Sequence, residues 1–337
     1  MINDSTVEAF ESSGGVKVYR MPVEAFPDHI TNCFLVLDDT ITLLDTGSGW
    51  DQSNQDLLKC FEVLRSKFNE KLSLKDIQRV ILTHGHIDHF GGVNWVVEET
   101  GAELGIHELD ASVIQHFNER LLSSTHGLRH FLNHSGMSRH TVDTLLHMNK
   151  WSKDTFHARN VDFTFDEGQI LDTPLVSYHT PGHCPGQVCM QLHDILFTAD
   201  HVLSRITPNQ APESITRNMG LGHYMESLEK VRKLEGIRIG LGGHELTMGN
   251  LSERIDDSIS FHEGRLEKTY NLLGEPKTIN EVSLGLFGKR EDYHVLLAML
   301  EAGAHLEYLY ERGRLVIVNI EEMEDDPDLA PLYRQAD

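Results

Sequence analysis

Short apolar runs separated by turn residues make up most of the first hundred positions of the chain. The runs 33–37 and 41–45, with two aspartates between them, predict a β-hairpin, and the run 79–84 predicts a buried strand. Helical spacing of apolar residues follows in 51–69 and again in 91–102, where a glycine ends the pattern. Strands and helices that alternate in this way are typical of an α/β fold.

A helical pattern interrupts this alternation in residues 107–160, where apolar side chains recur every three or four positions. We expect two or three helices inserted into the α/β frame there. The strand pattern then returns, and His193 and Asp194 predict a turn between two of the strands. The predicted strands are 161–165, 174–180, 186–192, 194–200 and 237–245, with a predicted helix at 223–236.

The pattern changes once more after residue 249. Apolar positions step by three and four through 251–273, and Thr278 and Glu281 have the spacing of a capping box for a second helix. Residues 292–302 predict a third helix ended by Gly303, and the runs 304–310 and 314–320 predict a hairpin. Three helices and a hairpin predict a small winged-helix-like domain. The predicted divisions are a flexible N-terminus at 1–13, an α/β domain at 14–249 that carries the helical insertion at about 107–160, and a C-terminal domain at 250–337.

Composition and charge narrow the classes of partner. The 337 residues carry a formal net charge of −23, which disfavours nucleic acid and anionic membranes and fits a small-molecule substrate. Residues from 250 onward hold 9 Lys and Arg against 19 Asp and Glu, a net of −10, so we expect this tail to cover the core or form a homodimer rather than bind nucleic acid. The four cysteines are scattered, and the N-terminus shows no signal peptide pattern. With no apolar run long enough to span a membrane, the expected location is the cytoplasm.

Residues 83–92, THGHIDHFGG, crowd three histidines and one aspartate into a loop that directly follows a predicted buried strand. Three further predicted strands end close to a histidine or an aspartate in the same way. The side chains concerned are His84, His86, Asp88, His89, His183, Asp200 and His244. Five histidines and two aspartates are about the number that two zinc-like ions need when one ligand is shared. The sequence therefore predicts a dinuclear metal site.

These motifs closely resemble the metallo-β-lactamase superfamily, in order and over about residues 15–245. The pattern H-x-H-x-D-H is complete at 84–89, and LLDTGSG, TPGHCPG and TADH match three further motifs of the superfamily. The resemblance implies an αββα sandwich. It assigns His84, His86 and His183 to one ion, Asp88, His89 and His244 to the other, and Asp200 as the bridge. This ligand set looks like that of the glyoxalase II, lactonase and nuclease branches. The C-terminal region is similar to relatives of lactamase-β-like protein 2 that carry a winged-helix tail.

The expected cofactors are two divalent metal ions, with zinc first and iron or manganese as alternatives, because imidazole and carboxylate ligands suit all three. The predicted nucleophile is a hydroxide that bridges the ions, and the catalytic carboxylates are Asp88 and Asp200. Asp45 is expected to accept a hydrogen bond from a ligand histidine and so orient it, with capping of the turn before Gly47 as the less favoured alternative. His201 and His179 are further candidates for residues that support the ligands without binding the metal. His201 could donate a proton to the leaving group or simply pack beneath the site, and the alternative for His179 is a structural role.

Two other groups of residues have an ordinary and a functional interpretation. Cys184, next to a predicted ligand, is expected to be a packed thiol, with metal contact or redox sensitivity as the alternative. In the insertion, His126, His130 and His134 share one helical face, which fits a pocket lining or a solvated stripe better than another metal site.

The predicted function is a metal-dependent hydrolase that cleaves a small carboxylic ester, thioester or lactone, with the insertion setting specificity. One alternative is a phosphodiesterase or ribonuclease that uses the same metals, which the predicted winged helix favours and the acidic charge disfavours. The other alternative is a non-enzymatic metal-binding sensor, which a missing ligand would support; the ligand set is complete.

Overall fold

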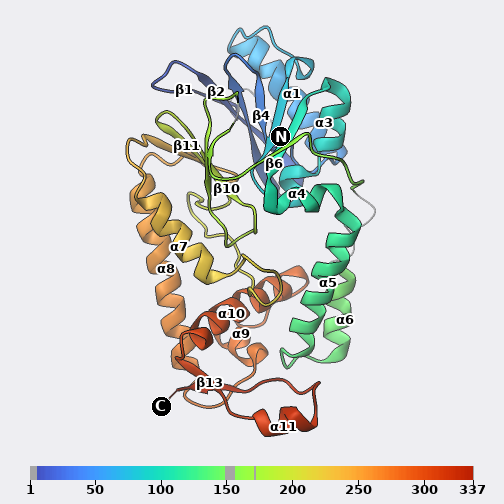
Figure 1. Ribbon diagram of the computed structural model, residues 1–337, viewed down its shortest axis with the longest axis vertical. Helices are drawn as coiled ribbons and strands as arrows, with labels where there is room; N and C mark the ends of the chain where they lie inside the picture. The colour runs from blue at the N-terminus through green and yellow to red at the C-terminus, as the bar shows by residue number, and fades with distance from the viewer. Residues whose placement is uncertain (1–5, 149–155, 171, 337) are drawn as a thin grey trace. The chain divides into compact units, whose positions relative to one another are not determined.

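A computed structural model of the chain describes residues 6–148, 156–170 and 172–336 (Figure 1). It divides into two compact units. Unit 1 comprises Met1–Phe117, Phe156–Pro208 and Ser227–Ile255, and unit 2 comprises Asn118–Thr155, Asn209–Glu226 and Asp256–Asp337. Unit 2 thus contains most of the predicted insertion as well as the C-terminal region.

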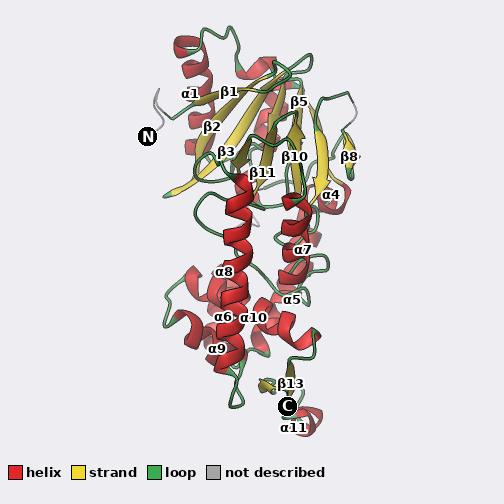
Figure 2. Cartoon of the chain, turned by 90° about the vertical axis from the view of Figure 1, so that its left-hand side faces the viewer, coloured by secondary structure: helices red, strands yellow, loops and turns green. Residues whose placement is uncertain are grey.

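Unit 1 contains two β-sheets, whose strands are drawn in yellow in Figure 2. The first sheet has seven strands in chain order: β1 (Glu8–Glu11), β2 (Lys17–Phe26), β3 (His29–Leu37), β4 (Thr42–Leu44), β5 (Arg79–Leu82), β6 (Glu103–His107) and β7 (Phe163–Phe165). Neighbours from β1 to β4 pair antiparallel, and neighbours from β4 to β7 pair parallel.

The second sheet has five strands in the order β12-β11-β10-β9-β8. Its members are β8 (Gly168–Gln169), β9 (Val176–His179), β10 (Val188–Leu192), β11 (Ile195–Ala199) and β12 (Ile239–Gly242). Only the pair β11–β12 is parallel among these. The predicted turn between β10 and β11 is confirmed, and His193 adopts φ 54° in it.

The core of unit 1 lies between the two sheets. Phe34 of β3 and Phe197 of β11 meet edge to face with ring centroids 5.2 Å apart, and apolar residues of β2 to β5 and β10 to β12 belong to the same buried cluster. The helices of this part are α1 (Asp51–Lys67), α2 (Ile87–Phe90), α3 (Val93–Thr100) and α4 (Glu108–Gln115), with a short 3₁₀ turn at Leu74–Asp76. Helix α1 buries Leu57, Phe61 and Leu64 at helical spacing. The expected metallo-β-lactamase sandwich is confirmed.

Unit 2 is built mainly from helices around a second buried cluster. Its elements include α5 (Phe117–Asn133), α6 (Arg139–Met148), α9 (Ile279–Phe287), α10 (Tyr293–Glu311), β13 (Leu315–Ile317), α11 (Ile320–Asp325) and β14 (Tyr333–Gln335). Two further helices, α7 (Leu221–Arg232) and α8 (Leu251–Leu272), agree with the predicted helices at 223–236 and 251–273. The predicted capping box of Thr278 and Glu281 is present at the start of α9. No helix among the described residues is long and apolar enough to cross a membrane.

Three predictions about elements are wrong. Residues 8–11 of the predicted flexible N-terminus form strand β1, paired with β2; residues 1–5 lie outside the described part. The predicted strand at 304–310 is part of α10, and β13 pairs with β14 instead. Gly303 does not end the third helix but lies inside α10, where a Cβ would come within 2.6 Å of the Phe131 ring. The winged-helix arrangement is therefore not confirmed.

Candidate metal centre

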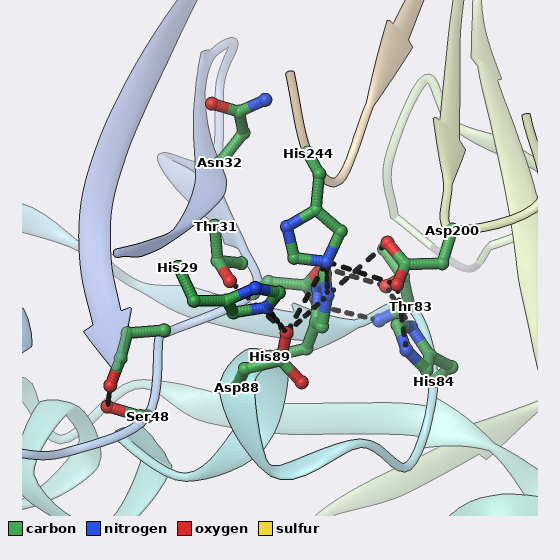
Figure 3. A network of polar contacts seen from close by, with 12 residues as sticks. His29, Thr31, Asn32, Ser48, Thr83, His84, Asp88, His89, Asp200 and His244 are labelled. Atoms are coloured by element: carbon green, nitrogen blue, oxygen red, sulfur yellow. Dashed lines mark hydrogen bonds and ion pairs between the residues drawn. The ribbon is translucent and has the colours of Figure 1, made fainter. Parts of the chain in front are cut away.

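All seven predicted ligand residues come shortly after a strand of unit 1, five of them in loops and two, Asp88 and His89, in the short helix α2. His84, His86, Asp88 and His89 follow β5, His183 lies between β9 and β10, Asp200 follows β11, and His244 follows β12. Parallel neighbouring strands end at the same edge of a sheet, so β11 and β12 deliver Asp200 and His244 side by side. Figure 3 shows five of the seven converging.

The side chains form two groups that share Asp200. We call His84, His86, His183 and Asp200 site 1, and Asp88, His89, His244 and Asp200 site 2. In site 2, His244 Nε2 lies 3.1 Å from Asp200 Oδ2 and 3.4 Å from Asp88 Oδ2. His89 Nε2 lies 3.4 Å from Asp200 Oδ1, 3.5 Å from Asp88 Oδ2 and 3.4 Å from His244 Nε2.

Those separations test whether an ion fits site 2. Nitrogen and oxygen ligands about 2.0–2.2 Å from one ion lie roughly 2.8–3.1 Å apart at octahedral angles and roughly 3.3–3.6 Å apart at tetrahedral angles, a range of roughly 2.8–3.6 Å. The observed distances between the ligand atoms of site 2, 3.1–3.5 Å, fall within this range. The geometry of site 2 therefore fits a single metal ion.

Site 1 is slightly wider and is also suited to an ion. Asp200 Oδ2 lies 3.6 Å from His183 Nε2 and 3.9 Å from His84 Nε2, and all four ligand atoms of the site lie within 4.8 Å of one another. His84 Nε2 is buried and makes no hydrogen bond to any part of the chain that the structure describes. A buried imidazole nitrogen aimed at a carboxylate and two more imidazoles is the arrangement that a metal completes.

The backbone at Gly243 passes very close to two ligands of site 2, Asp200 and His89. A Cβ at Gly243 would clash with Asp200 Oδ1 and lie 2.7 Å from His89 Cε1. The glycine before His244 is therefore needed to let the strand end pass directly behind these two ligands.

The buried carboxylate of Asp45 orients one histidine of each site. Asp45 Oδ2 accepts from His89 Nδ1 at 2.8 Å and from the Thr83 hydroxyl at 2.7 Å. Because that hydroxyl donates to Asp45, it can accept from His84 Nδ1, which lies 3.0 Å away. Both histidines are thereby held with Nε2 available to a metal, the contact that the role predicted for Asp45 requires.

His244 is oriented by the backbone instead. Its Nδ1 donates to the carbonyl oxygen of Ile30 at 2.7 Å, which leaves Nε2 facing Asp88 and Asp200. Ile30 lies at the start of β3, so the β2–β3 hairpin is part of site 2, a connection that the sequence did not indicate.

A second carboxylate missed by sequence analysis joins two ligand loops. Asp110, fully buried in α4, accepts from Gly85 N at 2.8 Å and from Gly186 N at 2.9 Å. Gly85 lies between His84 and His86, and Gly186 lies in the loop of His183. Asp110 thus fixes the relative positions of the loops that carry the histidines of site 1.

The charges of the two sites differ. Burial lowers the pKa of both His84 and His86, that of His86 to about 3, so these imidazoles are neutral and their lone pairs are available. At site 2 burial acts in the same direction, but the adjacent carboxylates outweigh it and raise the pKa of His244 to about 10. Burial raises and the neighbouring histidines lower the pKa of Asp200, and the histidines prevail. The pKa of His89 is raised as well, so in site 2 a bound cation can balance the charge of the Asp88 and Asp200 carboxylates in place of protons on the two histidines.

The structure places His201, His179 and Cys184 in or beside the ligand loops but not among the ligands. His201 is fully buried, which lowers its pKa to about 3 and favours the packed role over the proton donor. His179 Nε2 donates to the carbonyl oxygen of Pro185 at 2.8 Å, so it supports the loop of His183, in line with the structural role. Cys184 is a buried free thiol whose pKa is raised by burial, as a packed side chain requires. In the insertion, both ring nitrogens of His134 lie 2.8 Å from backbone carbonyl oxygens, which does not favour a metal site there.

Two side chains of β3 that sequence analysis missed also face site 2. His29 Nε2 lies 3.0 Å from Asp88 Oδ2, and Thr31 Oγ1 donates to the same oxygen at 3.3 Å (Figure 3). Alternation along a strand puts His29 and Thr31 on one face, and this polar pair ahead of the apolar run 33–37 is the signal that could have indicated them.

Comparisons with curated proteins give distant relatives. The chain is 24% identical to the lactamase-like protein aptB of Emericella nidulans over 279 residues, which cover 78% of this chain and 70% of that protein. It is 25% identical to the atrochrysone carboxyl ACP thioesterase of Aspergillus fumigatus over 253 residues, 72% of this chain and 60% of that one. With the lactamase-like protein nscB of Arthroderma otae it shares 31% identity over 143 residues, which cover 36% of this chain and only 39% of that protein.

Comparison with solved structures supports the same fold over nearly the whole chain. A metallo-beta-lactamase family protein from Thermus thermophilus matches with a TM-score of 0.76 and 25% identity, covering 95% of this chain and 98% of that one. A beta-lactamase domain protein from Burkholderia ambifaria matches with a TM-score of 0.74 and 23% identity, covering 98% and 94%. The family model described as the metallo-beta-lactamase superfamily matches residues 27–244, the span that contains all seven candidate ligands. The chain belongs to the metallo-β-lactamase superfamily.

Proposed function

We propose that the chain is a metal-dependent hydrolase that cleaves a small carboxylic ester, thioester or lactone. The observation that carries the proposal is the ligand geometry, in which histidine nitrogens and aspartate oxygens face one another at the spacing of metal ligands around a shared Asp200. Two divalent ions, zinc first with iron or manganese as alternatives, would activate a water molecule and polarise a substrate carbonyl oxygen there.

The residues of the chain have distinct parts in this proposal. Asp200 would bridge the ions, and Asp88 would complete site 2 from the first turn of α2. Asp45 and Thr83 hold two ligand histidines in the tautomer that binds metal. No serine or cysteine nucleophile is needed, which agrees with a Cys184 that is buried and whose pKa is raised by burial.

A carbonyl substrate is favoured over a phosphodiester for three reasons. One distant relative is named as a thioesterase of an acyl carrier protein, and this name supports carbonyl chemistry for the present chain. The main argument for ribonuclease activity was the predicted winged helix, whose predicted hairpin strand at 304–310 lies in helix α10. The net charge of −23 also disfavours a nucleic-acid substrate. A small-molecule substrate, a cytoplasmic location and a homodimer stay proposals from the sequence.

The test is a substrate panel on protein purified with its metal content measured. Nitrophenyl esters, acyl thioesters and lactones should be compared with bis-p-nitrophenyl phosphate and single-stranded RNA. We expect carbonyl turnover that Asp200→Ala abolishes, since this variant removes the ligand common to both sites and controls for contaminating enzymes. Phosphodiester turnover lost in the same variant would support the ribonuclease alternative, and two bound ions without turnover of any substrate would support the sensor alternative.

A further inference from the structure

His29 is a histidine outside the ligand motifs that nevertheless faces site 2. It is the first residue of β3, directly after the two-residue turn of Pro27 and Asp28, where Asp28 adopts φ 61°. Its side chain is 48% exposed, so the ring lies at the solvent side of the site, opposite the buried His89. From this solvent-exposed position the His29 ring can still contact an ion bound at site 2.

The distances place His29 Nε2 in the same shell of atoms as the candidate ligands. It lies 3.0 Å from Asp88 Oδ2, the oxygen that is 3.4 Å from His244 Nε2 and 3.5 Å from His89 Nε2. Ligand atoms of His29, Asp88 and His244 all lie within 4.8 Å of one another. A separation of about 3.0 Å is what two ligands at right angles on one ion would show.

The imidazole of His29 is held in this position by aromatic neighbours. It stacks on Phe26 across the hairpin, with ring centroids 6.1 Å apart and planes 25° apart, and Phe26 in turn meets the edge of Trp50 at 5.1 Å. On its other side the His244 ring lies 4.6 Å away. The ring is therefore oriented by packing as well as by Asp88.

The hairpin itself is fixed to site 2 at two more points. The carbonyl oxygen of Ile30 accepts from His244 Nδ1 at 2.7 Å, and Thr31 donates to Asp88 Oδ2 at 3.3 Å. Three consecutive residues of β3 thus contact two candidate ligands of site 2. Hydrogen bonds from neighbouring residues to metal ligands commonly fix the geometry of a metal site.

We propose that His29 is a further protein ligand of the ion at site 2, through Nε2. This inference rests on the proposed metal site and adds a residue to it. With Asp88, His89, His244 and Asp200, site 2 would then offer five protein ligands and leave one open position on a six-coordinate ion. Under this inference, iron or manganese, which accept six nitrogen and oxygen ligands, rank ahead of tetrahedral zinc at site 2, whereas zinc stays first at site 1.

The test measures metal binding without turnover, so its result does not depend on finding the substrate. Apoprotein is titrated with manganese and, separately, with zinc against a chromophoric chelator, for wild type, His29→Ala and His29→Gln. Glutamine can still donate an N–H to Asp88 but is a poor metal ligand, and His116→Ala, at an exposed histidine that ends α4, is the matched control. We expect both His29 variants to weaken one of the two dissociation constants by about 10–100-fold and the control to leave both unchanged.

A crystal structure of the manganese-loaded protein, with anomalous scattering from the ion, gives an independent answer. The expected result is an ion at bonding distance from His29 Nε2, about 2.0–2.3 Å. If His29→Gln binds metal as the wild type does, His29 is only a hydrogen-bond donor to Asp88 and the inference is wrong, while the proposed function stands. If the wild type binds no ion at all, both proposals fail together.

Discussion

At the scale of single residues, Asp45 orients histidines of both metal sites, whereas the sequence predicted a contact with only one ligand histidine. The same carboxylate accepts from His89 directly and from His84 through Thr83, so it serves both metal sites. It also adopts φ 59°, a left-handed conformation that aspartate and asparagine tolerate better than most residues.

We therefore predict that Asp45→Asn keeps the fold but weakens binding at both sites by about 10–100-fold. The carboxylate accepts on both oxygens, from Thr83 N at Oδ1 and from His89 Nδ1 and the Thr83 hydroxyl at Oδ2, and the NH2 group of an amide would face one of these donors without being able to accept. The measurement is the zinc content of each protein after dialysis against a series of chelator concentrations. Asp39→Asn, at an exposed turn position, is the control and should match the wild type. Equal metal retention in wild type and Asp45→Asn would show that the Asp45 contact has no part in orienting the ligands.

The seven candidate ligands were predictable because each one follows a strand within a short motif, so local spacing carried the information. His29 and Asp110 were not, since neither belongs to such a motif. The contact between His29 and Asp88 joins residues 59 positions apart, and that between Asp110 and Gly186 joins residues 76 apart. Contacts of this separation depend on how strands are paired, which a single sequence does not specify.

At the scale of elements, helix α4 connects the two loops that carry the histidines of site 1 through Asp110. We predict that Asp110→Ala weakens binding at site 1 by at least 10-fold, because two backbone N–H groups lose the acceptor that fixes the loops. The thermal midpoint in chelator, measured beside metal affinity, separates the two effects. A structural role alone would lower the midpoint of the apoprotein and leave affinity unchanged.

Glu108→Gln is the matched control, since Glu108 is an exposed carboxylate in the first turn of the same helix. It removes a charge close to Asp110 without touching the loops. A loss of affinity in this variant comparable to that of Asp110→Ala would mean that the charge of α4, rather than the two hydrogen bonds, affects the metal.

Gly303 was predicted to end a helix, but in the structure it lies inside helix α10. Gly303 looked like a helix end, and residues 304–310 looked like a strand, yet the helix continues through both. The buried residues Leu296, Met299, Leu306 and Leu309 recur at helical spacing on both sides of Gly303, so packing of one face outweighs the glycine. Apolar periodicity also made α8 predictable, and the spacing of Thr278 and Glu281 made the capping box of α9 predictable.

A pair of glycine substitutions tests this account. Gly303→Ala should destabilise the protein by about 1–3 kcal/mol, because the added Cβ would come within 2.6 Å of the Phe131 ring and 2.9 Å of Pro212. Gly264→Ala in α8 should instead stabilise it by up to about 1 kcal/mol, since a Cβ there meets nothing within 4 Å and alanine favours a helix. Urea unfolding of both variants measures the free energies. Stabilisation by Gly303→Ala would show that the close approach to Phe131 is not needed.

At the scale of the whole molecule, the sequence placed the helical insertion within the α/β domain, whereas the compact units divide the chain differently. Leu132 and Leu145 of the insertion belong to one buried cluster with Leu296 and Met299 of the C-terminal region. The sequence did not predict this cluster because it joins segments that are far apart in the chain. Each helix has an apolar face, but its sequence does not specify which other helix that face packs against. The polar ligands lie in unit 1, apart from this cluster.

This division leads to a prediction about metal removal. Ions that bind only the folded site stabilise it by about 4 kcal/mol at a thousand times their dissociation constant, and a chelator removes that contribution. Amide hydrogen exchange should then accelerate in the segments that carry the ligands, because local opening exposes the amides nearest the lost contacts first. The segments are 29–32, 83–92, 183–187, 199–202 and 242–246.

The amides of α9 are the internal reference, since this helix belongs to unit 2 and contributes no residue to the groups of histidines and carboxylates that could hold an ion among the described residues. We expect their exchange rates to stay the same within error when the metal is removed. Equal acceleration in α9 would show that both units open as one cooperative body. If chelation changes no segment while the protein demonstrably loses its ions, the metals contribute nothing to folding, and the seven side chains must hold their arrangement through protein contacts such as those of Asp45, Asp110 and the Ile30 carbonyl oxygen.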